Sequence, residues 1–246
     1  MKNNGHVVVV GGSKGLGNLI AKRFIEQEYV VTVISRTPLI DEPRVNYVYA
    51  DLETIDSYVN EVVEKVLIHG GRIRYLIFCQ RYRGSGDSWI GEIQVSLTAT
   101  RLIIKSFSDF FCQEGDRAIG VVSSVYAEFI GGSQPDSYHV AKAGLNQLVR
   151  YNACEMGRKG IRINAVMPLT YLKPESSHYY LKNKRLMNLY QKLVPLGTLG
   201  KVEDSANLIE FLCSAKASFI NGQSIYVDGG VSVVWPEELA KSFAGL

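Results

Sequence analysis

Cysteine is scarce in this sequence, with four residues in a chain of 246. They are Cys79, Cys112, Cys154 and Cys213, and no two have the C-x-x-C spacing that is typical of zinc sites and redox motifs. We therefore expect neither a disulfide framework nor a metal site. The four side chains are interpreted as buried apolar groups of a protein from the reducing cytoplasm.

Long apolar runs and clusters of one charge are missing as well. No stretch approaches the ~18 consecutive apolar residues of a membrane-spanning helix, and Met1–Asn4 lead straight into a strand-like run without a signal peptide. The formal net charge is only +3, and the basic residues are scattered along the chain. These features predict no membrane and no nucleic-acid partner, and they favour a cytoplasmic protein.

The chain does contain a regular alternation of strand-like and helix-like segments. Runs rich in β-branched residues predict strands near 6–11, 29–35, 46–49, 74–79, 117–123, 161–166 and 223–227. Helical spacing of apolar residues predicts helices near 15–28, 54–69, 89–112, 137–157 and 202–214. This alternation indicates an α/β fold of the Rossmann type, a doubly wound parallel sheet with helices on both faces. The length suits a single domain over residues 1–246.

Three glycines, Gly11, Gly15 and Gly17, lie between the first predicted strand and the first predicted helix. Glycines at such a turn allow positive φ, close approach of a pyrophosphate, and packing of the helix on the strand. The free N–H groups at the helix start attract phosphate. A tight structural turn would use the same glycines, but the strand before and the helix after favour a dinucleotide site.

The end of the second predicted strand, Ser35-Arg36, indicates which dinucleotide binds. An acid here would hold the ribose 2′-hydroxyl of NAD, and the next acid, Asp41, lies too far along the chain. A guanidinium instead forms paired hydrogen bonds with a 2′-phosphate, and Lys14 adds a second cation. The pattern favours NADP(H) over NAD(H). The alternative is that Arg36 is a solvated loop charge.

Tyr138 and Lys142 are four residues apart, so they lie on the same face of a predicted helix. A nearby ammonium favours the phenolate, and we expect it to lower the pKa of the Tyr138 phenol from about 10. Such a tyrosine exchanges a proton with a substrate oxygen near neutral pH. By itself the spacing is also common on solvated helices.

Further motifs accompany this pair: Asp51-Leu52 after the third predicted strand, Ser123-Ser124 at the end of another, and the segments Arg162–Pro168, Pro195–Gly197 and Gly222–Gly230. With the glycines and the Tyr138–Lys142 pair, almost the whole chain resembles the classical short-chain dehydrogenase/reductase family, and within it the ketoreductases. The resemblance implies hydride transfer between a nicotinamide cofactor and a carbonyl compound, as part of a biosynthetic pathway.

The resemblance also implies roles for individual residues. Tyr138 is expected to donate the proton, Ser124 to hydrogen-bond the carbonyl oxygen, and Lys142 to hold the nicotinamide ribose. Ser124 is preferred to Ser123 because neighbouring strand residues point in opposite directions; a strand-end cap would be the structural alternative. The expected cofactor contacts are Gly11, Ser13, Lys14, Gly15, Leu16, Gly17, Ser35, Arg36, Asp51, Leu52, Cys79, Gln80, Tyr138, Lys142, Pro168 and Leu169.

The sequence departs from the family pattern in three places. Residues 78–81, Phe-Cys-Gln-Arg, replace the usual Asn-Asn-Ala-Gly, and Pro168-Leu169 replaces Pro-Gly. Ser96 stands where the family has a catalytic Asn that holds a water in a proton relay. Serine is shorter but still binds water, so we expect lower efficiency and an unchanged reaction type.

Arg81 and Arg83 follow the altered strand end, close to the expected substrate position. They are interpreted as a clamp for a carboxylate, a phosphate or a carrier-bound substrate, and the alternative is a solvated surface loop. Tyr171 is a further candidate substrate contact. It begins a segment, about 170–195, that the resemblance identifies as a lid over the substrate.

Two further expectations concern assembly and activity. In the family, the helices that correspond to 89–112 and 137–157 pack into dimers and tetramers. The apolar stripes Leu102, Ile103, Ile104 and Phe107, and Leu145, Leu148 and Val149, indicate a homodimer or homotetramer here unless they face the sheet. The apolar tail after Gly230 is expected to reach a neighbouring subunit or to cap the pocket.

The alternatives to a reductase are a cofactor-binding protein with weak or no catalysis, and an epimerase or dehydratase.

Overall fold

A seven-stranded sheet forms the centre of the molecule. The computed structural model describes residues 4–38, 42–172 and 182–246. The strand order is β3-β2-β1-β4-β5-β6-β9, and every neighbouring pair is parallel. The strands are β1 His6–Val10, β2 Val30–Ser35, β3 Asn46–Tyr49, β4 Ile73–Phe78, β5 Ala118–Val122, β6 Arg162–Pro168 and β9 Ser224–Val227. The predicted Rossmann-type sheet is confirmed.

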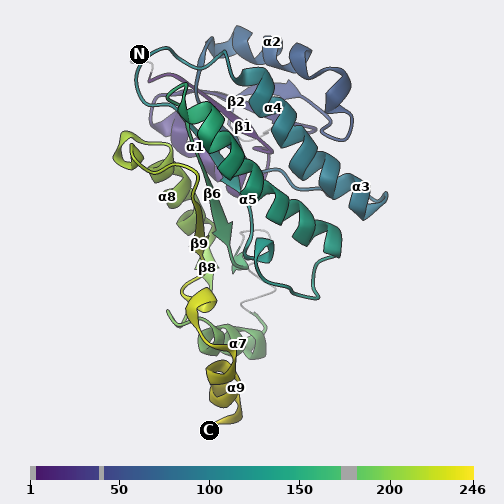
Figure 1. The fold of residues 1–246 in the computed structure, drawn as a ribbon, viewed down its shortest axis with the longest axis vertical. Helices are drawn as coiled ribbons and strands as arrows, with labels where there is room; N and C mark the ends of the chain where they lie inside the picture. The colour runs from purple at the N-terminus through teal and green to yellow at the C-terminus, as the bar shows by residue number, and fades with distance from the viewer. Residues whose placement is uncertain (1–3, 39–41, 173–181) are drawn as a thin grey trace.

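Helices cover both faces of this sheet, as Figure 1 shows. The five predicted helices are present as α1 Gly15–Glu26, α2 Val59–Gly70, the group α3 Ser88–Glu92 with α4 Ala99–Phe107, α5 Asp136–Gly157, and α8 Val202–Leu212. The third predicted helix is not uniform, because a π-helical turn, η2 Ile93–Thr98, joins α3 to α4. Short π segments inside helices occur frequently at functional sites.

The alternation of side chains along β1 explains the two helical layers. Successive residues of a strand point to opposite faces, and β1 is a run of valines that is buried on both sides. Val7 and Val9 belong to the core cluster that includes α1 and α8, whereas Val8 and Val10 belong to the cluster that includes α2, α4 and α5. A continuous apolar strand is therefore required at the centre of the sheet.

The apolar stripes of α4 and α5 face mainly inward. The core cluster includes Ile103, Ile104, Phe107, Leu145 and Val149, and Leu102 and Leu148 pack against it partly buried. These stripes therefore pack the sheet, and they are not an exposed surface for assembly. The exposed large hydrophobic residues of α5 are Val140 and Tyr151.

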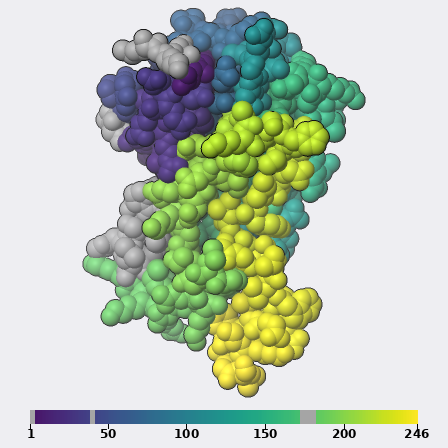
Figure 2. All heavy atoms as spheres, turned by 90° about the vertical axis from the view of Figure 1, so that its left-hand side faces the viewer, coloured from purple at the N-terminus to yellow at the C-terminus, as the bar shows by residue number. Residues whose placement is uncertain are grey.

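The C-terminal tail forms a helix, α9 Pro236–Ala244, which packs against α7 Lys184–Leu193. Figure 2 shows the two segments together at the lower end of the molecule. Of the predicted lid, the structure describes α7 and the short strand β7 Tyr171–Leu172, which pairs with β8 Gly200–Lys201; residues 173–181 lie outside the described part of the chain. The tail therefore contacts a helix of the segment that the sequence predicts to be a lid.

The cysteines are all free thiols, but they are not uniformly buried as expected. Cys213 is buried, Cys79 and Cys112 are half-buried, and Cys154 is exposed on α5. The expectation was wrong for Cys154 because its helix turns that position away from the sheet. Over residues 4–38, 42–172 and 182–246, no helix has both the length and the apolar character to span a membrane.

Candidate active site

Ser124, Tyr138 and Lys142 come together where β5 ends. Ser124 begins the short helix η3 Val125–Ala127 just beyond β5, and α5, which carries Tyr138 and Lys142, packs against both η3 and β6. Ser124, Tyr138 and Lys142 are 7%, 9% and 3% exposed. The Ser124 hydroxyl lies close enough to Tyr138 to act on the pKa of its phenol. The structure thus brings the three predicted side chains into one nearly dry cluster.

The neighbouring Ser123 points elsewhere. Its hydroxyl donates to the backbone carbonyl of Lys142 at 3.3 Å, whereas the Ser124 hydroxyl faces Tyr138 and accepts from the Tyr126 N–H at 3.2 Å. Strand geometry separates the two serines in this way. Of the pair, Ser124 is the one that a substrate oxygen held by Tyr138 would meet.

Lys142 is anchored by the strand beside it. Its ammonium donates to the carbonyl oxygen of Val122 at 2.9 Å and lies 5.6 Å from the centroid of the Tyr138 ring. Burial lowers the pKa of Lys142 to about 8, and the Glu92 carboxylate opposes this shift. The charge of the lysine therefore depends on its neighbours in the pH range near neutrality.

The electrostatics of Tyr138 differ from the prediction. Burial raises the pKa of the Tyr138 phenol, although the hydrogen bond from Ser124 and the charge of Arg81 both act to lower the pKa. The prediction of a lowered pKa was wrong because desolvation of the phenolate raises the pKa by more than Ser124 and Arg81 together lower it. The cation that acts most directly on the phenol is Arg81 rather than Lys142.

Arg81 lies over the face of Tyr138, with its guanidinium carbon 4.7 Å from the ring centroid. It also donates a hydrogen bond to the side-chain oxygen of Gln134. Its side chain is 37% exposed, so part of the guanidinium is open to a ligand. Arg83 is exposed. Tyr171 packs instead against the core cluster of α1 and α8.

A buried carboxylate, Glu92, was missed by sequence reasoning. It is 3% exposed at the end of α3, and it accepts a hydrogen bond of 2.9 Å from Ser96, which is fully buried. Glu92 lies 3.9 Å from the Nε atom of Arg81. The available signal was an acid one helical turn before Ser96 in an otherwise apolar region.

The glycine turn forms a cradle without room for side chains. Gly11 has a φ of +76°, and an added Cβ would lie 2.6 Å from the backbone nitrogen of Gln80. At Gly17 a Cβ would lie 2.5 Å from the carbonyl oxygen of Gly11. Gly15 has a φ of +54°, and Lys14 precedes the helix without capping it through its side chain. The uncapped start of α1 has no acid in its first turn, so it fits a pyrophosphate.

At the predicted adenosine end of the site lies Glu53, a second acid that sequence reasoning missed. Arg36 pairs with Glu53 at 3.2 Å, and both side chains are substantially exposed. The hydroxyl of Thr37 donates to Ser13 at 3.2 Å, which joins the glycine turn to the end of β2. Ser35 is buried and bonds the carbonyl of Thr37. Arg36 is thus accessible, and an acid next to it competes for its guanidinium.

The other expected cofactor contacts lie along the same edge of the sheet. Leu16 and Leu52 are buried, and Asp51 accepts a hydrogen bond from the Glu53 N–H at 3.1 Å. Burial raises the pKa of the Cys79 thiol to about 12, so this cysteine is an apolar neighbour of the glycine turn.

Most of the chain matches the model of a known protein family. This model, described as enoyl-(acyl carrier protein) reductase, matches residues 10–232. The chain belongs to the short-chain dehydrogenase/reductase family. It is thus an oxidoreductase of a family that uses NAD(P)(H).

Known proteins are similar to this one over nearly the whole chain. A tropinone reductase homolog of Arabidopsis thaliana is 38% identical, covering 92% of this chain and 91% of the relative. A probable 2,4-dienoyl-CoA reductase of Bacillus subtilis is 29% identical over 91% and 95%. Among solved structures, an aldohexose dehydrogenase of Thermoplasma acidophilum has a TM-score of 0.83 at 25% identity, covering 95% and 96%.

Two departures from the short-chain dehydrogenase/reductase pattern have structural consequences. Gln80 donates to the hydroxyl of Thr100 at 2.7 Å and so ties the altered β4 end to the start of α4. At the end of β6, the Leu169 N–H bonds the carbonyl of Val227 at 3.1 Å, so Pro168-Leu169 extends the pairing with β9. Each of the two altered segments therefore makes a hydrogen bond that ties it to a neighbouring element.

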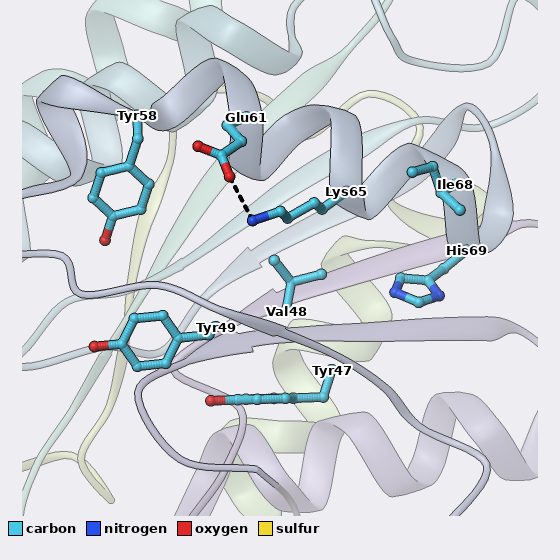
Figure 3. A pocket seen from close by; sticks show the side chains of 8 residues that line it. All are labelled: Tyr47, Val48, Tyr49, Tyr58, Glu61, Lys65, Ile68 and His69. Carbon is cyan, nitrogen blue, oxygen red and sulfur yellow. Dashed lines mark hydrogen bonds and ion pairs between the residues drawn. The ribbon is translucent and has the colours of Figure 1, made fainter.

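A hollow of about 450 Å³ lies elsewhere, between β3 and α2. Figure 3 shows Tyr47 and Tyr49 on one side of it, and the exposed Glu61–Lys65 ion pair of 2.6 Å on the other. The strands β2, β1 and β4 separate β3 from β5. This hollow thus plays no part in the cluster around Tyr138.

Proposed function

We propose that this short-chain dehydrogenase/reductase is an NADP(H)-dependent reductase that converts a keto group to an alcohol. The observation that carries the proposal is the convergence of Ser124, Tyr138 and Lys142 in one buried cluster beside β5. The relatives whose names describe reductases support the same reaction class.

A bound nicotinamide would supply the hydride to the carbonyl carbon. The chain's own residues then act on the carbonyl oxygen, on which negative charge develops. Tyr138 donates its proton to this oxygen, and Ser124 hydrogen-bonds the same atom, so that both groups stabilise the developing charge. Lys142 holds the ribose hydroxyls with an ammonium fixed by the Val122 carbonyl.

The cofactor would lie with its pyrophosphate at the start of α1, over Gly11 and Gly15, and with its adenosine end near Asp51. The choice of NADP(H) rests on Arg36, which is exposed at the end of β2. Lys14 is also exposed, next to the glycine turn. Two cations at this place favour a 2′-phosphate.

The test of the reaction type is a panel of ketones and β-ketoacyl thioesters, with NADPH oxidation followed by absorbance. We expect at least one keto compound to be reduced with formation of the matching alcohol. A panel in which NADPH is bound but no keto compound is consumed would contradict the proposal and favour a cofactor-binding protein without catalysis. The altered segment 78–81 is the feature that favours this second candidate.

The substrate is proposed to carry a carboxylate or phosphate, because Arg81 presents a partly exposed guanidinium beside Tyr138. Arg81→Gln is expected to raise KM for an anionic keto compound about 10-fold or more, because a charge-assisted hydrogen bond contributes about 1.5–3 kcal/mol. KM for a neutral ketone should change less than about threefold by the same reasoning. Steady-state kinetics with both substrates measures the difference. Arg83→Gln tests the second residue of the predicted clamp, and Arg101→Gln, at an exposed position on α4, is the matched control. Equal effects on both substrates would show that Arg81 does not bind the anion.

The assembly is proposed to be a homodimer or homotetramer formed through α3 and α5. The exposed large hydrophobic residues of these helices are Trp89, Ile90, Val140 and Tyr151. A cytoplasmic location is also part of the proposal, in keeping with the free thiols.

A further inference from the structure

A second group of polar side chains lies behind the Ser124–Tyr138–Lys142 cluster. Glu92 and Ser96 are one turn apart where α3 passes into the π-helical turn η2, and both are almost completely buried. The Ser96 hydroxyl donates to Oε2 of Glu92 at 2.9 Å. The other oxygen, Oε1, lies 3.9 Å from Arg81 Nε. A buried carboxylate is costly unless it is hydrogen-bonded and faces positive charge, and Glu92 has both.

The charges around Glu92 come from several elements. Arg81 follows β4, and Tyr138 and Lys142 are on α5, which packs against α3 and η2. Cys79 also influences the pKa of Lys142, and the Tyr126 ring lies 6.3 Å from that of Tyr138. Among the described residues, Glu92 is the one carboxylate whose charge acts appreciably on Lys142, while Arg81 acts in the opposite sense.

We propose that Glu92 is a positioning residue of this site: its buried carboxylate, fixed by Ser96, holds the Arg81 guanidinium over the Tyr138 ring and supplies the negative charge that balances the Lys142 ammonium in the same buried cluster. The consequence for catalysis rests on the proposed function, because a charged Lys142 is what holds the ribose and supports Tyr138. Glu92 and Ser96 together thereby occupy the place of the family's asparagine with a fixed negative charge instead of a neutral amide.

The proposal is tested by the titration of Lys142 itself. In protein labelled with ¹³C at the lysine Cε atoms, the NMR signal that disappears in Lys142→Arg belongs to Lys142. Its midpoint is expected near a pKa of about 8, set mainly by burial. Removal of the Glu92 charge leaves burial and Arg81, which both lower the pKa of Lys142, opposed only by the smaller influence of Cys79. In Glu92→Gln, which keeps the shape, the midpoint should therefore fall by about one pH unit or more.

Three controls make the result specific. Glu92→Asp keeps the carboxylate and should keep the midpoint within about 0.5 unit of the wild type. Glu61→Gln removes an equally charged side chain from the surface of α2 and should shift the midpoint by less than about 0.2 unit. Arg81→Gln, at a partly exposed position, removes the opposing cation and should raise the midpoint.

Each result of the titration either supports the proposal or contradicts it. A fall of less than about 0.5 unit in Glu92→Gln, an equal fall in Glu61→Gln, or no rise in Arg81→Gln would each overturn the proposal. The titration needs no turnover, so it stands even if no keto substrate is found. Where turnover is measured, the basic limb of the kcat/KM profile of Glu92→Gln should move to lower pH with the midpoint. A uniform loss of kcat with an unmoved profile would show a merely structural role.

Discussion

Tyr138→Phe is expected to reduce the rate of NADPH-dependent carbonyl reduction by about 10²–10⁴-fold, the usual contribution of a positioned proton donor. The substitution removes one hydroxyl and keeps the ring that Arg81 covers. NADPH affinity, followed by fluorescence titration, should stay within about threefold of the wild type, because the proposed contacts with the cofactor phosphates are at the start of α1 and at Arg36.

The raised pKa of Tyr138 supports the direction of this prediction. A phenol that burial keeps protonated at neutral pH is ready to give its proton to an alkoxide, which is a far stronger base. The hydrogen bond with Ser124 and the cation of Arg81 stabilise the phenolate that is left behind. Burial thus keeps the phenol protonated before the proton transfer, and the positive charge of Arg81 stabilises the phenolate after it.

The matched control for this variant is Tyr126→Phe. The Tyr126 ring lies 6.3 Å from that of Tyr138, but its hydroxyl pairs with Ser133 at 2.9 Å. Its loss should change the rate less than about threefold. If Tyr138→Phe retained more than about a tenth of the wild-type rate, or if both variants lost activity equally, Tyr138 would not be the proton donor.

Arg36→Asp is expected to weaken NADPH binding by about 10- to 100-fold, because a charge-assisted bond of about 1.5–3 kcal/mol is lost. The introduced carboxylate also repels the 2′-phosphate and can accept a hydrogen bond from the ribose of NADH. The affinity for NADH should therefore hold or improve. Dissociation constants of both cofactors, measured at one ionic strength, give the change in preference.

Glu53→Gln provides the matched variant for this prediction. The Arg36–Glu53 pair is solvent-exposed, and such pairs contribute about 0–1 kcal/mol, so a phosphate displaces the carboxylate at little cost. Removal of the acid should strengthen NADPH binding by up to about fivefold. An unchanged ratio of NADPH to NADH affinity in Arg36→Asp would show that Arg36 does not recognise the 2′-phosphate.

Much of the fold could be predicted because it depends on short-range patterns. The valines of β1 are apolar without interruption, and that pattern indicates a strand covered on both faces. The glycines at 11, 15 and 17 sit where backbone conformation and contact exclude side chains. The π-helical turn between α3 and α4 escaped prediction because its sequence has the same helical spacing as its flanks.

The pairing of charges could not be predicted in the same way. Glu92 and Arg81 come from different elements, and so do Arg36 and Glu53. Their proximity is set by how the loop after β4 lies against α3 and how the loop after β3 returns to β2. The pKa of Tyr138 depends on the degree of burial, which spacing along a helix does not give.

By itself, the sequence determined the order of strands and helices and the glycine turn, because these follow from local periodicity. It also determined that Ser124, Tyr138 and Lys142 are candidates for one site, because they belong to motifs of fixed spacing. Only the tertiary structure decided that Tyr138 is too buried to be an acidic phenol, that Arg81 covers its ring, and that a buried carboxylate lies behind both. The physical reason is that desolvation and Coulomb interactions depend on distances through space between residues remote in the chain.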